Sequence, residues 1–505
     1  MEFAMIETGW WSILPPLIAI VLALITKEVY SSLFIGLFSG VLIYAFAGGG
    51  GIVKAASTAF DMMFSKISGN AYMIIFLALL WAIVVLVSKS GGREAYGRWA
   101  GKKLRSRRSA GLATALLGVL IFIDDGFNCL TVGTVMRPIT DRLRVSREKL
   151  AYIIDATAAP ICIIAPVSSW AVAVASEVSS TDGFHVFLST IPYNLYALLT
   201  ILMVVFVCAS GKDFGPMKRA EERALAAEPE AGTAEESDAP KGRVIDLVLP
   251  ILVLIVCAIL GMAYVGGFFS GVSFSEAIGE NPAAGLTLGA FAGLVTAFVL
   301  YIPRRLMKPK DFISNIVGGI GSIIPPMLIL VLSWSLGGVC RELIGTGEFI
   351  SGFVAGGGVA LNFLPFIIFV VAAVMSFSMG TSWGTFGMLI PIVTMICASD
   401  GAGRFLIPAL GATLAGSVYG DHCSPISDTT ILASTGADCK HIGHVETQLP
   451  YATLVAAVCA AGYLITGFTL TPWISLAAGA VLLIAALLIL NKVRFKAKDK
   501  DAAAS

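Results

Sequence analysis

Charge is scarce in this 505-residue sequence. Asp, Glu, Lys and Arg make up 13% of it, about half of the roughly 25% that is typical of soluble domains. Hydrophobic residues make up 57%, and the mean hydropathy is +0.87. This balance excludes a soluble globular protein. The 34 basic and 33 acidic residues nearly cancel, and no strongly basic domain stands apart, so the composition also argues against a nucleic-acid-binding protein.

Further absences exclude other classes of protein. The first ten residues contain no Lys or Arg, so no cleavable signal peptide is expected. The sequence contains no GxxxxGK[ST] loop and no hydrophilic stretch long enough for an ATPase domain, which argues against an ATP-driven pump. The nine cysteines include no CxxC pair, and we interpret most of them as small buried residues. An intramembrane protease is disfavoured because HExxH is absent and Val418-Tyr419-Gly420-Asp421 lacks the first glycine of GxGD. We expect neither an enzyme nor a cofactor.

Apolar runs of about twenty residues recur from end to end, and each can cross a bilayer. We therefore predict an all-α polytopic membrane protein with about eleven transmembrane helices. Two further apolar stretches, 110–140 and 361–396, are too long for one helix and are interrupted by polar and glycine residues. We interpret them as two opposed re-entrant hairpins. The predicted spans are 11–26, 29–47, 69–88, 150–176, 186–209, 246–266, 283–301, 320–339, 404–431, 446–468 and 472–491.

Basic residues predict the orientation of the chain. Clusters at 89–108 and 142–149 flank the first hairpin, so both of its ends face the same side. The best topology puts the N-terminus outside and the C-terminus in the cytoplasm, across the inner membrane of a bacterial cell. It then leaves only four of the 34 basic residues outside, namely Lys54, Lys66, Arg341 and Arg404.

The two halves of the chain resemble each other. Amphipathic stretches occur at 52–68 and 304–318, and an Ala-Thr-x-Ala step follows each hairpin, at 156–159 and 412–415. Two such halves with opposite orientation form the inverted-repeat plan of secondary transporters. The predicted boundaries are a first repeat at 1–210, a solvated cytoplasmic linker at 211–245, a second repeat at 246–468, and a terminal helix with a basic tail at 469–505.

Carboxylates at membrane depth are the strongest functional signal, because a charge at the bilayer centre costs about 2.5–3.5 kcal/mol. No Lys or Arg lies at comparable depth in the predicted topology, although Arg137 near a hairpin end could reach one. Such carboxylates must be protonated, hydrogen-bonded or neutralised by a bound cation. The alternative is that they cap broken helices. The predicted metal-binding carboxylates are Asp125, Asp155, Asp421 and Asp428, and Asp124 is a further ion-binding candidate.

Polar residues are densest at Gly420–Thr430, inside an otherwise apolar span. Pro425 must break the helix there, and the hydroxyl, carboxylate and carbonyl oxygens around the break suit sodium. The tip at 380–385 offers similar groups, although Ser and Thr can also simply hold helices together. His422 could titrate near neutrality or be packed. The other candidate substrate- or ion-binding residues are Asn128, Thr157, Ser168, Ser169, Thr381, Ser382, Trp383, Thr385, Ser424, Ser427 and Thr429.

One further pattern, Cys439 to His444, superficially resembles a metal-binding clip. We place it in a cytoplasmic turn with no fourth ligand in view, so it is not expected to bind a metal.

Three stretches carry a resemblance to a known family. The stretches GDHCSPISDTTILASTGADCKHIGHVETQLPY (420–451), GTSWGTFGMLIP (380–391) and DDGFNCLTVGTVMRPITD (124–141) resemble the NhaC-type sodium/proton antiporter family, within the ion-transporter superfamily. The resemblance covers nearly the whole chain. It implies a scaffold domain, a mobile transport domain that holds the two hairpins, elevator-type alternating access and a homodimer. Relatives with similar motifs exchange organic anions such as malate and lactate, or move amino acids.

Two hypotheses about function follow from these observations. The first is a secondary active transporter that exchanges Na⁺, and with it Li⁺, for H⁺ across the cell membrane. The second is sodium- or proton-coupled transport of a small organic anion or an amino acid through the same hairpin tips, with Trp383 lining the pocket. The absence of an arginine at depth favours the first reading, since arginine is the usual partner of a substrate carboxylate. A passive channel is less compatible with buried broken helices.

Overall fold

The computed structural model describes residues 4–26, 28–178, 183–226, 242–349, 360–399 and 401–502, and every regular element in these ranges is a helix. The first half contains α1 (Leu14–Thr26), α2 (Val29–Ala47), α3 (Ile52–Gly69), α4 (Ala71–Lys89), α5 (Gly92–Lys103), α6 (Arg107–Leu120), α7 (Asp125–Arg142), α8 (Arg147–Ala156), α9 (Ala159–Cys162), α10 (Ser169–Glu177), α11 (Gly183–Thr190), α12 (Leu195–Ser210) and α13 (Gly215–Ala226). The second half contains α14 (Val244–Val265), α15 (Phe274–Glu280), α16 (Pro282–Tyr301), α17 (Pro309–Gly338), α19 (Leu364–Met379), α20 (Ser382–Cys397), α21 (Leu406–Cys423), α22 (Asp428–Ala437), α23 (His441–Thr469) and α24 (Pro472–Ala502).

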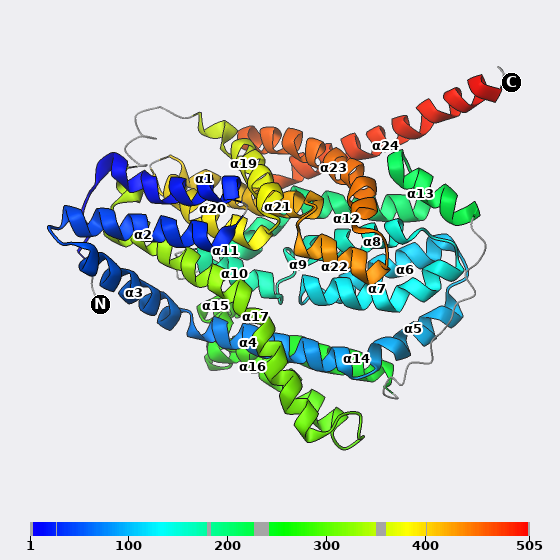
Figure 1. The fold of residues 1–505 in the computed structure, drawn as a ribbon, viewed down its shortest axis with the longest axis horizontal. Coiled ribbons are helices and arrows are strands. Elements are labelled where there is room, and N and C mark those ends of the chain that lie inside the picture. The colour runs from blue at the N-terminus through cyan, green and yellow to red at the C-terminus, as the bar shows by residue number, and fades with distance from the viewer. Residues whose placement is uncertain are drawn as a thin grey trace.

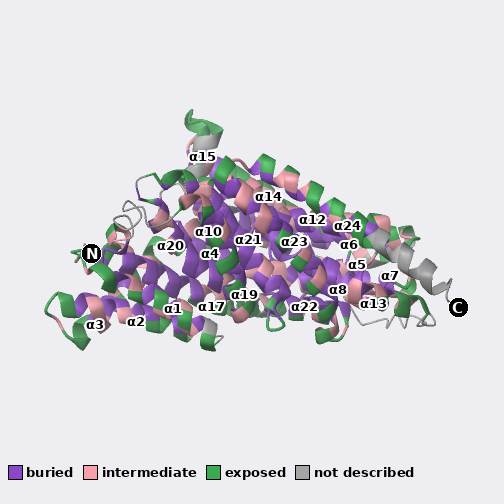
Figure 2. Cartoon of the chain, turned by 90° about the horizontal axis from the view of Figure 1, so that it is seen from above, coloured by how far each residue is buried: buried purple, intermediate pink, exposed green. Residues whose placement is uncertain are grey.

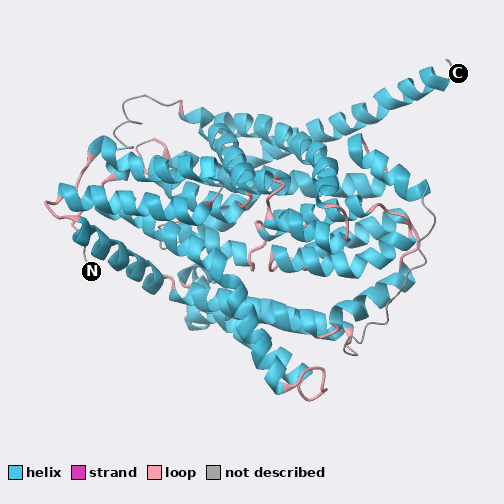
Figure 3. Ribbon diagram, in the orientation of Figure 1, coloured by secondary structure: helices cyan, strands magenta, loops and turns pink. Residues whose placement is uncertain are grey.

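The predicted all-helical membrane protein is confirmed. Within the described ranges, nine helices are long and apolar enough to cross a membrane, and Figure 3 shows helices throughout, joined by short loops. The count of eleven spans stays a prediction. The difference arises partly because two of the predicted spans, 150–176 and 404–431, are divided into shorter helices that do not reach spanning length individually.

The division of these two spans follows from their proline residues. The first contains Pro160 and Pro166, and it folds as α8, α9 and α10 with irregular segments between them. In the second, α21 ends at Cys423 and α22 begins at Asp428. The predicted break at Pro425 is therefore confirmed, as expected for a residue that lacks an N–H donor and clashes with the preceding helical turn.

Both predicted hairpins fold as pairs of helices. In the first, α6 and α7 are antiparallel, because Arg142 at the end of α7 donates to the carbonyl of Leu104, just before α6, at 3.1 Å. In the second, α19 ends at Met379 and is capped by Gly380, and α20 begins at Ser382. The φ of +68° at Gly380 is unfavourable for any residue with a Cβ atom. How far either pair enters a membrane remains a prediction.

Two amphipathic segments differ from the expected organisation. The amphipathic stretch 304–318 continues into the predicted span 320–339 without a break, since α17 runs from Pro309 through to Gly338 as one helix. The segment 211–245, interpreted as a solvated linker, contains α13, which packs on α8 and α23. The sequence did not reveal this helix because its stability depends on buried contacts with distant parts of the chain.

The helices are arranged in an elongated bundle. The helices α4, α14, α16 and α17 pack together along one long side, and α6, α7, α8 and α22 form a second group (Figure 1). The two ends of the chain lie at opposite ends of the bundle in this view. Buried residues run through its middle, whereas exposed residues concentrate along the outer helices (Figure 2). The interrupted helices lie near this buried middle, although Pro425, Ile426 and Asp428 at the second break are exposed.

Candidate functional site

Four chain interruptions meet at the centre of the bundle. The turn between α6 and α7 contacts the start of α10, where the Ser169 amide donates to the Ile123 carbonyl at 3.0 Å. The turn between α19 and α20 contacts the break after α21, where the Ser424 hydroxyl donates to the Phe377 carbonyl at 2.8 Å. The sequence candidates from both halves are thus brought into one region.

The two halves are also in direct contact. The sulfur of Cys129 in α7 lies 3.7 Å from the Thr429 carbonyl in α22. One turn further along α7, a Cβ atom added to Gly133 would lie 2.5 Å from the backbone of Gly436. Only glycine permits this approach of the two helices, so α7 and α22 form a tight pair that carries Asp125 and Asp428 at their first positions.

Asp124 caps α7. Its carboxylate accepts from the Phe127 amide at 2.9 Å, and the residue is buried. Asp125 is partly exposed, and its Oδ1 accepts from the neighbouring Gly126 amide at 3.1 Å. Asp124 therefore has the capping role that sequence analysis named as the alternative to ion binding, whereas Asp125 has the more accessible carboxylate.

Asn128 joins the first hairpin to the broken span that follows it. Its Nδ2 lies 2.7 Å from the Gly118 carbonyl, 3.0 Å from that of Ile121 and 3.0 Å from that of Thr157. These are carbonyls left over at the ends of α6 and α8. Asn128 and Thr157 thus stabilise the broken backbone, and the Asn128 Oδ1 is buried without a partner.

Asp421 joins the second hairpin to α21. Its Oδ2 accepts from the Ser382 amide at 3.1 Å and from the Ser382 hydroxyl at 2.7 Å. Its Oδ1 is buried and has no hydrogen-bond partner. Thr381 caps α20 by accepting from the Gly384 amide at 3.4 Å, and the Thr385 hydroxyl returns to the Thr381 carbonyl at 2.9 Å. Asp421 is therefore a candidate carboxylate with one oxygen held by the start of α20 and the other unpartnered.

Asp155 forms a second centre with residues that lie far away in the sequence. Its Oδ2 accepts from Gln448 Nε2 at 2.8 Å and from the Thr430 hydroxyl at 3.1 Å, and it lies 3.3 Å from His444 Nε2. Asp155, His444 and Gln448 are all at most 1% exposed, and the Oδ1 of Asp155 has no partner.

His444 and Gln448 correct the sequence analysis. The segment Cys439–His444 was expected to be a cytoplasmic turn, but α23 begins at His441 and buries His444 against Asp155. The spacing of four residues between His444 and Gln448, which puts both on one helix face, was the available signal. No Lys or Arg was expected at the depth of the carboxylates, and the titratable partner of Asp155 is a histidine. Arg137 reaches none of them, because it pairs with Asp438 at 3.4 Å.

His422 is packed and hydrogen-bonded. Its Nδ1 lies 2.8 Å from the hydroxyl of Tyr196, a residue that sequence analysis missed, and its ring stacks on that of Tyr152 with centroids 6.3 Å apart. The His422 carbonyl accepts from the side chain of Gln448. His422 is therefore linked through Gln448 to the Asp155 centre.

The segment around the second break is more open. Asp428 is exposed, and its Oδ1 accepts from the Thr429 amide at 2.9 Å. Ser427 caps α22, and its hydroxyl lies 3.0 Å from that of Thr429. Asp428 is therefore the most exposed of the candidate carboxylates.

Ser168 and Trp383 have structural partners, whereas the Ser169 hydroxyl does not. The Ser168 hydroxyl caps α10 and donates to the Cys162 carbonyl at 2.8 Å. The Ser169 hydroxyl is buried without a partner. Trp383 packs edge-on against Trp170, with ring centroids 5.9 Å apart, so it bridges the second hairpin and α10.

The described residues were expected to include metal-binding carboxylates, namely Asp125, Asp155, Asp421 and Asp428. In the part of the chain that the structure describes, no three His, Cys, Asp or Glu side chains come together as metal ligands would.

Comparison with known proteins identifies the family. The model of the Na⁺/H⁺ antiporter family matches residues 171–468, which is more than half of the chain. The chain belongs to the Na⁺/H⁺ antiporter family. The match includes the second hairpin, Asp421, Asp428, His444 and Gln448, whereas Asp124, Asp125 and Asp155 precede it. Family membership indicates a multi-pass secondary transporter.

Individual relatives support this assignment. The chain is 38% identical to an uncharacterized protein of Haemophilus influenzae over 97% of both chains. It is 30% identical to the malate-2H(+)/Na(+)-lactate antiporter of Bacillus subtilis over 36% of this chain and 42% of that protein. Among solved structures, the YdaH transporter of Alcanivorax borkumensis shares the fold, with a TM-score of 0.54, 13% identity and coverage of 82% of this chain and 89% of that one.

Proposed function

We propose that this antiporter-family protein exchanges Na⁺ for H⁺ across the cell membrane by alternating access. The observation that carries the proposal is the state of Asp421, a buried carboxylate with one oxygen held by Ser382 and the other without a partner. A buried carboxylate in this position needs a compensating cation. A proton and a sodium ion can each supply that charge, and only one of them can bind at a time.

The Asp155 centre would serve the proton. Its partners His444, Gln448 and Thr430 supply hydrogen bonds rather than a shell of oxygen ligands. Histidine and carboxylate together form a group that accepts and releases protons. The two centres are connected through α21 and α22, so occupancy of one can influence the other.

The broken helices would provide the movement. Asp421 holds the turn between α19 and α20, and Asn128 holds the turn between α6 and α7. In the proposed cycle, the group of helices with both turns moves as a unit within an inverted-repeat, elevator-type homodimer, with the N-terminus outside. Ion binding at Asp421 would stabilise the closed second hairpin through Ser382.

The proposal is tested in proteoliposomes that contain a pH-sensitive dye. Addition of Na⁺, and separately of Li⁺, should collapse an imposed proton gradient. Asp421→Asn should abolish the response, whereas Asp311→Asn, which changes an exposed carboxylate in the first turn of α17, should not. A wild-type protein that responds to neither ion would overturn the proposal.

A second candidate is sodium- or proton-coupled exchange of a small organic anion or amino acid. The relative from Bacillus subtilis, whose name specifies malate and lactate, favours it, as does the Trp383–Trp170 pair beside the second hairpin. If only malate, lactate or an amino acid elicits proton or sodium movement in the same vesicles, this function replaces the first.

A further inference from the structure

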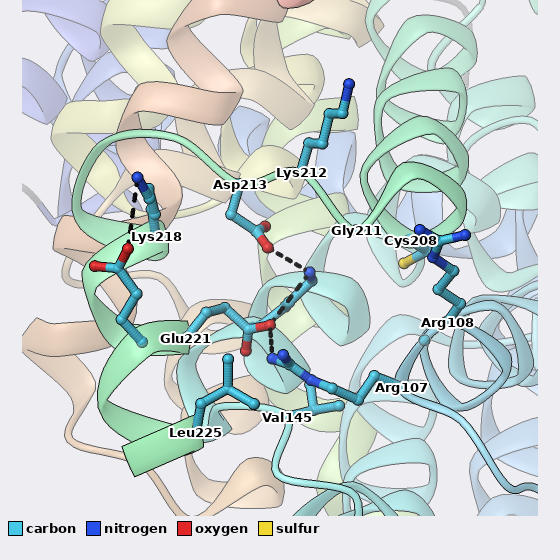
Figure 4. A pocket seen from close by; sticks show the side chains of 13 residues that line it. Arg107, Arg108, Val145, Cys208, Gly211, Lys212, Asp213, Lys218, Glu221 and Leu225 are labelled. Carbon is cyan, nitrogen blue, oxygen red and sulfur yellow. Dashed lines mark hydrogen bonds and ion pairs between the residues drawn. The ribbon is translucent and has the colours of Figure 1, made fainter. Parts of the chain in front are cut away.

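A cavity of about 530 Å³ lies outside the carboxylate site, where α6, α8, α12 and α13 meet. Its volume falls within the range of about 300–1,000 Å³ that is usual for small-molecule sites. The pattern of basic residues predicts that this end of the bundle is cytoplasmic. Figure 4 shows Arg107 next to Glu221, with Lys218 and Arg108 on either side and the Lys212 side chain extending away from Glu221.

The carboxylates of the cavity are already engaged. Glu221 pairs with Arg107 and lies 3.5 Å from the ammonium group of Lys149, and Asp213 lies 2.7 Å from the same ammonium group. The third carboxylate, Glu222, pairs with Lys218 at 3.5 Å within α13.

Two of the basic residues that line the cavity, Arg108 and Lys212, have no ion pair in the described part of the chain. The cavity is lined by five basic and three acidic residues. Arg108 is exposed, and its only described hydrogen bond is a long one of 3.4 Å to the Ser210 carbonyl. Lys212 is also exposed and has no ion pair in the described part of the chain. The Nε of Arg107 is buried and has no acceptor. The cavity therefore holds an excess of positive charge and unused donors.

One carboxylate of the protein itself, that of Glu221, is bound at the wall of the cavity in the way that an anionic ligand would be. The Glu221 carboxylate accepts from the Ser146 amide at 2.7 Å, at the N-terminus of α8, while Lys149 and Arg107 flank it. A helix N-terminus with adjacent cations is a standard anion site. Arg107 and Arg108 are the first two residues of α6. The Ser106 hydroxyl already caps this helix end by accepting from the Ser109 amide at 3.1 Å, and Arg107 pairs with Glu221, so Arg108 supplies the unused charged donors of α6.

We propose that this cavity binds a phosphate-bearing anion through Arg108 and Lys212. Two surplus cations match the double charge of a phosphate group, and the guanidinium fork of arginine matches its oxygen atoms. Val145 and Leu225 line the remaining wall and would contact an apolar part of the ligand. The phosphate belongs either to a soluble metabolite or to the headgroup of an anionic lipid.

A ligand in this cavity could affect the Asp155 centre through α8. Lys149 lies in the first turn of α8 and Asp155 in its last turn, about 9 Å apart along the helix. A ligand that binds α6 and the 211–213 segment at once would fasten α13 to α6 and α8. Binding would therefore stabilise the position of α8, on which the Asp155 centre depends.

The test uses the purified full-length protein and two probes. Inorganic pyrophosphate is titrated into protein in neutral detergent at constant ionic strength, and thermal unfolding is compared in nanodiscs of phosphatidylcholine with and without phosphatidylglycerol. The double variant Arg108→Gln/Lys212→Gln is compared with Arg105→Gln/Lys440→Gln, which removes two exposed charges that do not line the cavity.

Pyrophosphate should bind the wild type and the Arg105/Lys440 control equally, and the Arg108/Lys212 variant at least about tenfold more weakly, since that variant lacks both charged donors. If phosphatidylglycerol alone stabilises the wild type and this gain is lost in the Arg108/Lys212 variant, the phosphate source is lipid. If neither probe distinguishes the Arg108/Lys212 variant from the control, the proposal is wrong.

Discussion

The Oδ2 of Asp421 accepts both the amide and the hydroxyl hydrogen of Ser382, at 3.1 and 2.7 Å. This one oxygen connects α21, which ends two residues later, to the first residue of α20. The position of the second hairpin is therefore coupled to whatever neutralises the Asp421 carboxylate.

Ser382→Ala should weaken sodium binding without unfolding the protein. It removes the hydroxyl hydrogen bond to Asp421 and leaves the amide bond in place, which we expect to raise the apparent KM for sodium about tenfold, as for a hydrogen bond to a charged group. The measurement is sodium-driven proton efflux from proteoliposomes. Ser378→Ala, in the same hairpin, is the control. An equal KM for sodium in both variants would contradict a role of the Ser382 hydroxyl in sodium binding at Asp421.

Gln448→Leu should destabilise the Asp155 centre. The variant is similar in size but leaves the Asp155 Oδ2 and the His422 carbonyl without their shared donor. A buried acceptor that loses its partner costs about 1–3 kcal/mol. Thermal unfolding of the detergent-solubilised protein should show a lower midpoint, together with slower proton movement. An unchanged midpoint would mean that Gln448 is not the donor that stabilises Asp155.

Asn128→Asp should be more damaging than Asn128→Ala. The Nδ2 of Asn128 faces three backbone carbonyl oxygens, and a carboxylate in its place would oppose them with a negative charge, whereas alanine leaves room for water. We expect loss of transport in both variants, with a lower yield of folded protein for the aspartate. The reverse order of yields would show that these carbonyls have other partners.

Gly133→Ala should push α7 and α22 apart. The added Cβ would lie 2.5 Å from the Gly436 backbone, and overpacking of this kind costs about 1–3 kcal/mol. Gly321→Ala is the matched control, since no atom lies within 4 Å of the corresponding Cβ position. The unfolding midpoint should fall for the first variant alone.

Lys149→Met should lower stability by a similar amount throughout the pH range in which transport is measured. Burial lowers the pKa of the Lys149 ammonium, but the carboxylates of Asp213 and Glu221 outweigh this effect and raise it above its usual 10.5. A raised pKa means that the stabilisation is fully present below about pH 10.5 and is lost as the pH rises through the folded-state value. A destabilisation that disappears between pH 6 and pH 9 would contradict this assignment.

Local patterns predicted the parts of the fold that local physics determines. The length of the apolar runs predicted the helices, and Pro425 predicted the break between α21 and α22. Gly380 and Asp124 mark the turns of the two hairpins. These features depend on residues within a few positions of one another.

The partners within the site could not be predicted in this way. Asp155 and His444 are 289 residues apart, and the sequence around His444 resembles a surface turn because Cys439 and Lys440 precede it. The docking of α13 likewise depends on Lys149, which lies 64 residues before Asp213. Only the folded arrangement shows that these polar residues satisfy one another.

The contact between α7 and α22 has a consequence for how the protein is made. Cys129 and Thr429 are separated by 300 residues, so at about 5–20 residues per second the ribosome finishes α22 some 15–60 seconds after α7. During that interval the first hairpin has no α22 to pack against, so Asp124 and Asp125 lack part of the protein environment that surrounds them in the folded chain. The incomplete chain must therefore be protected from degradation until α22 is made. Variants that weaken the first hairpin should be degraded by quality-control proteases before the protein is complete.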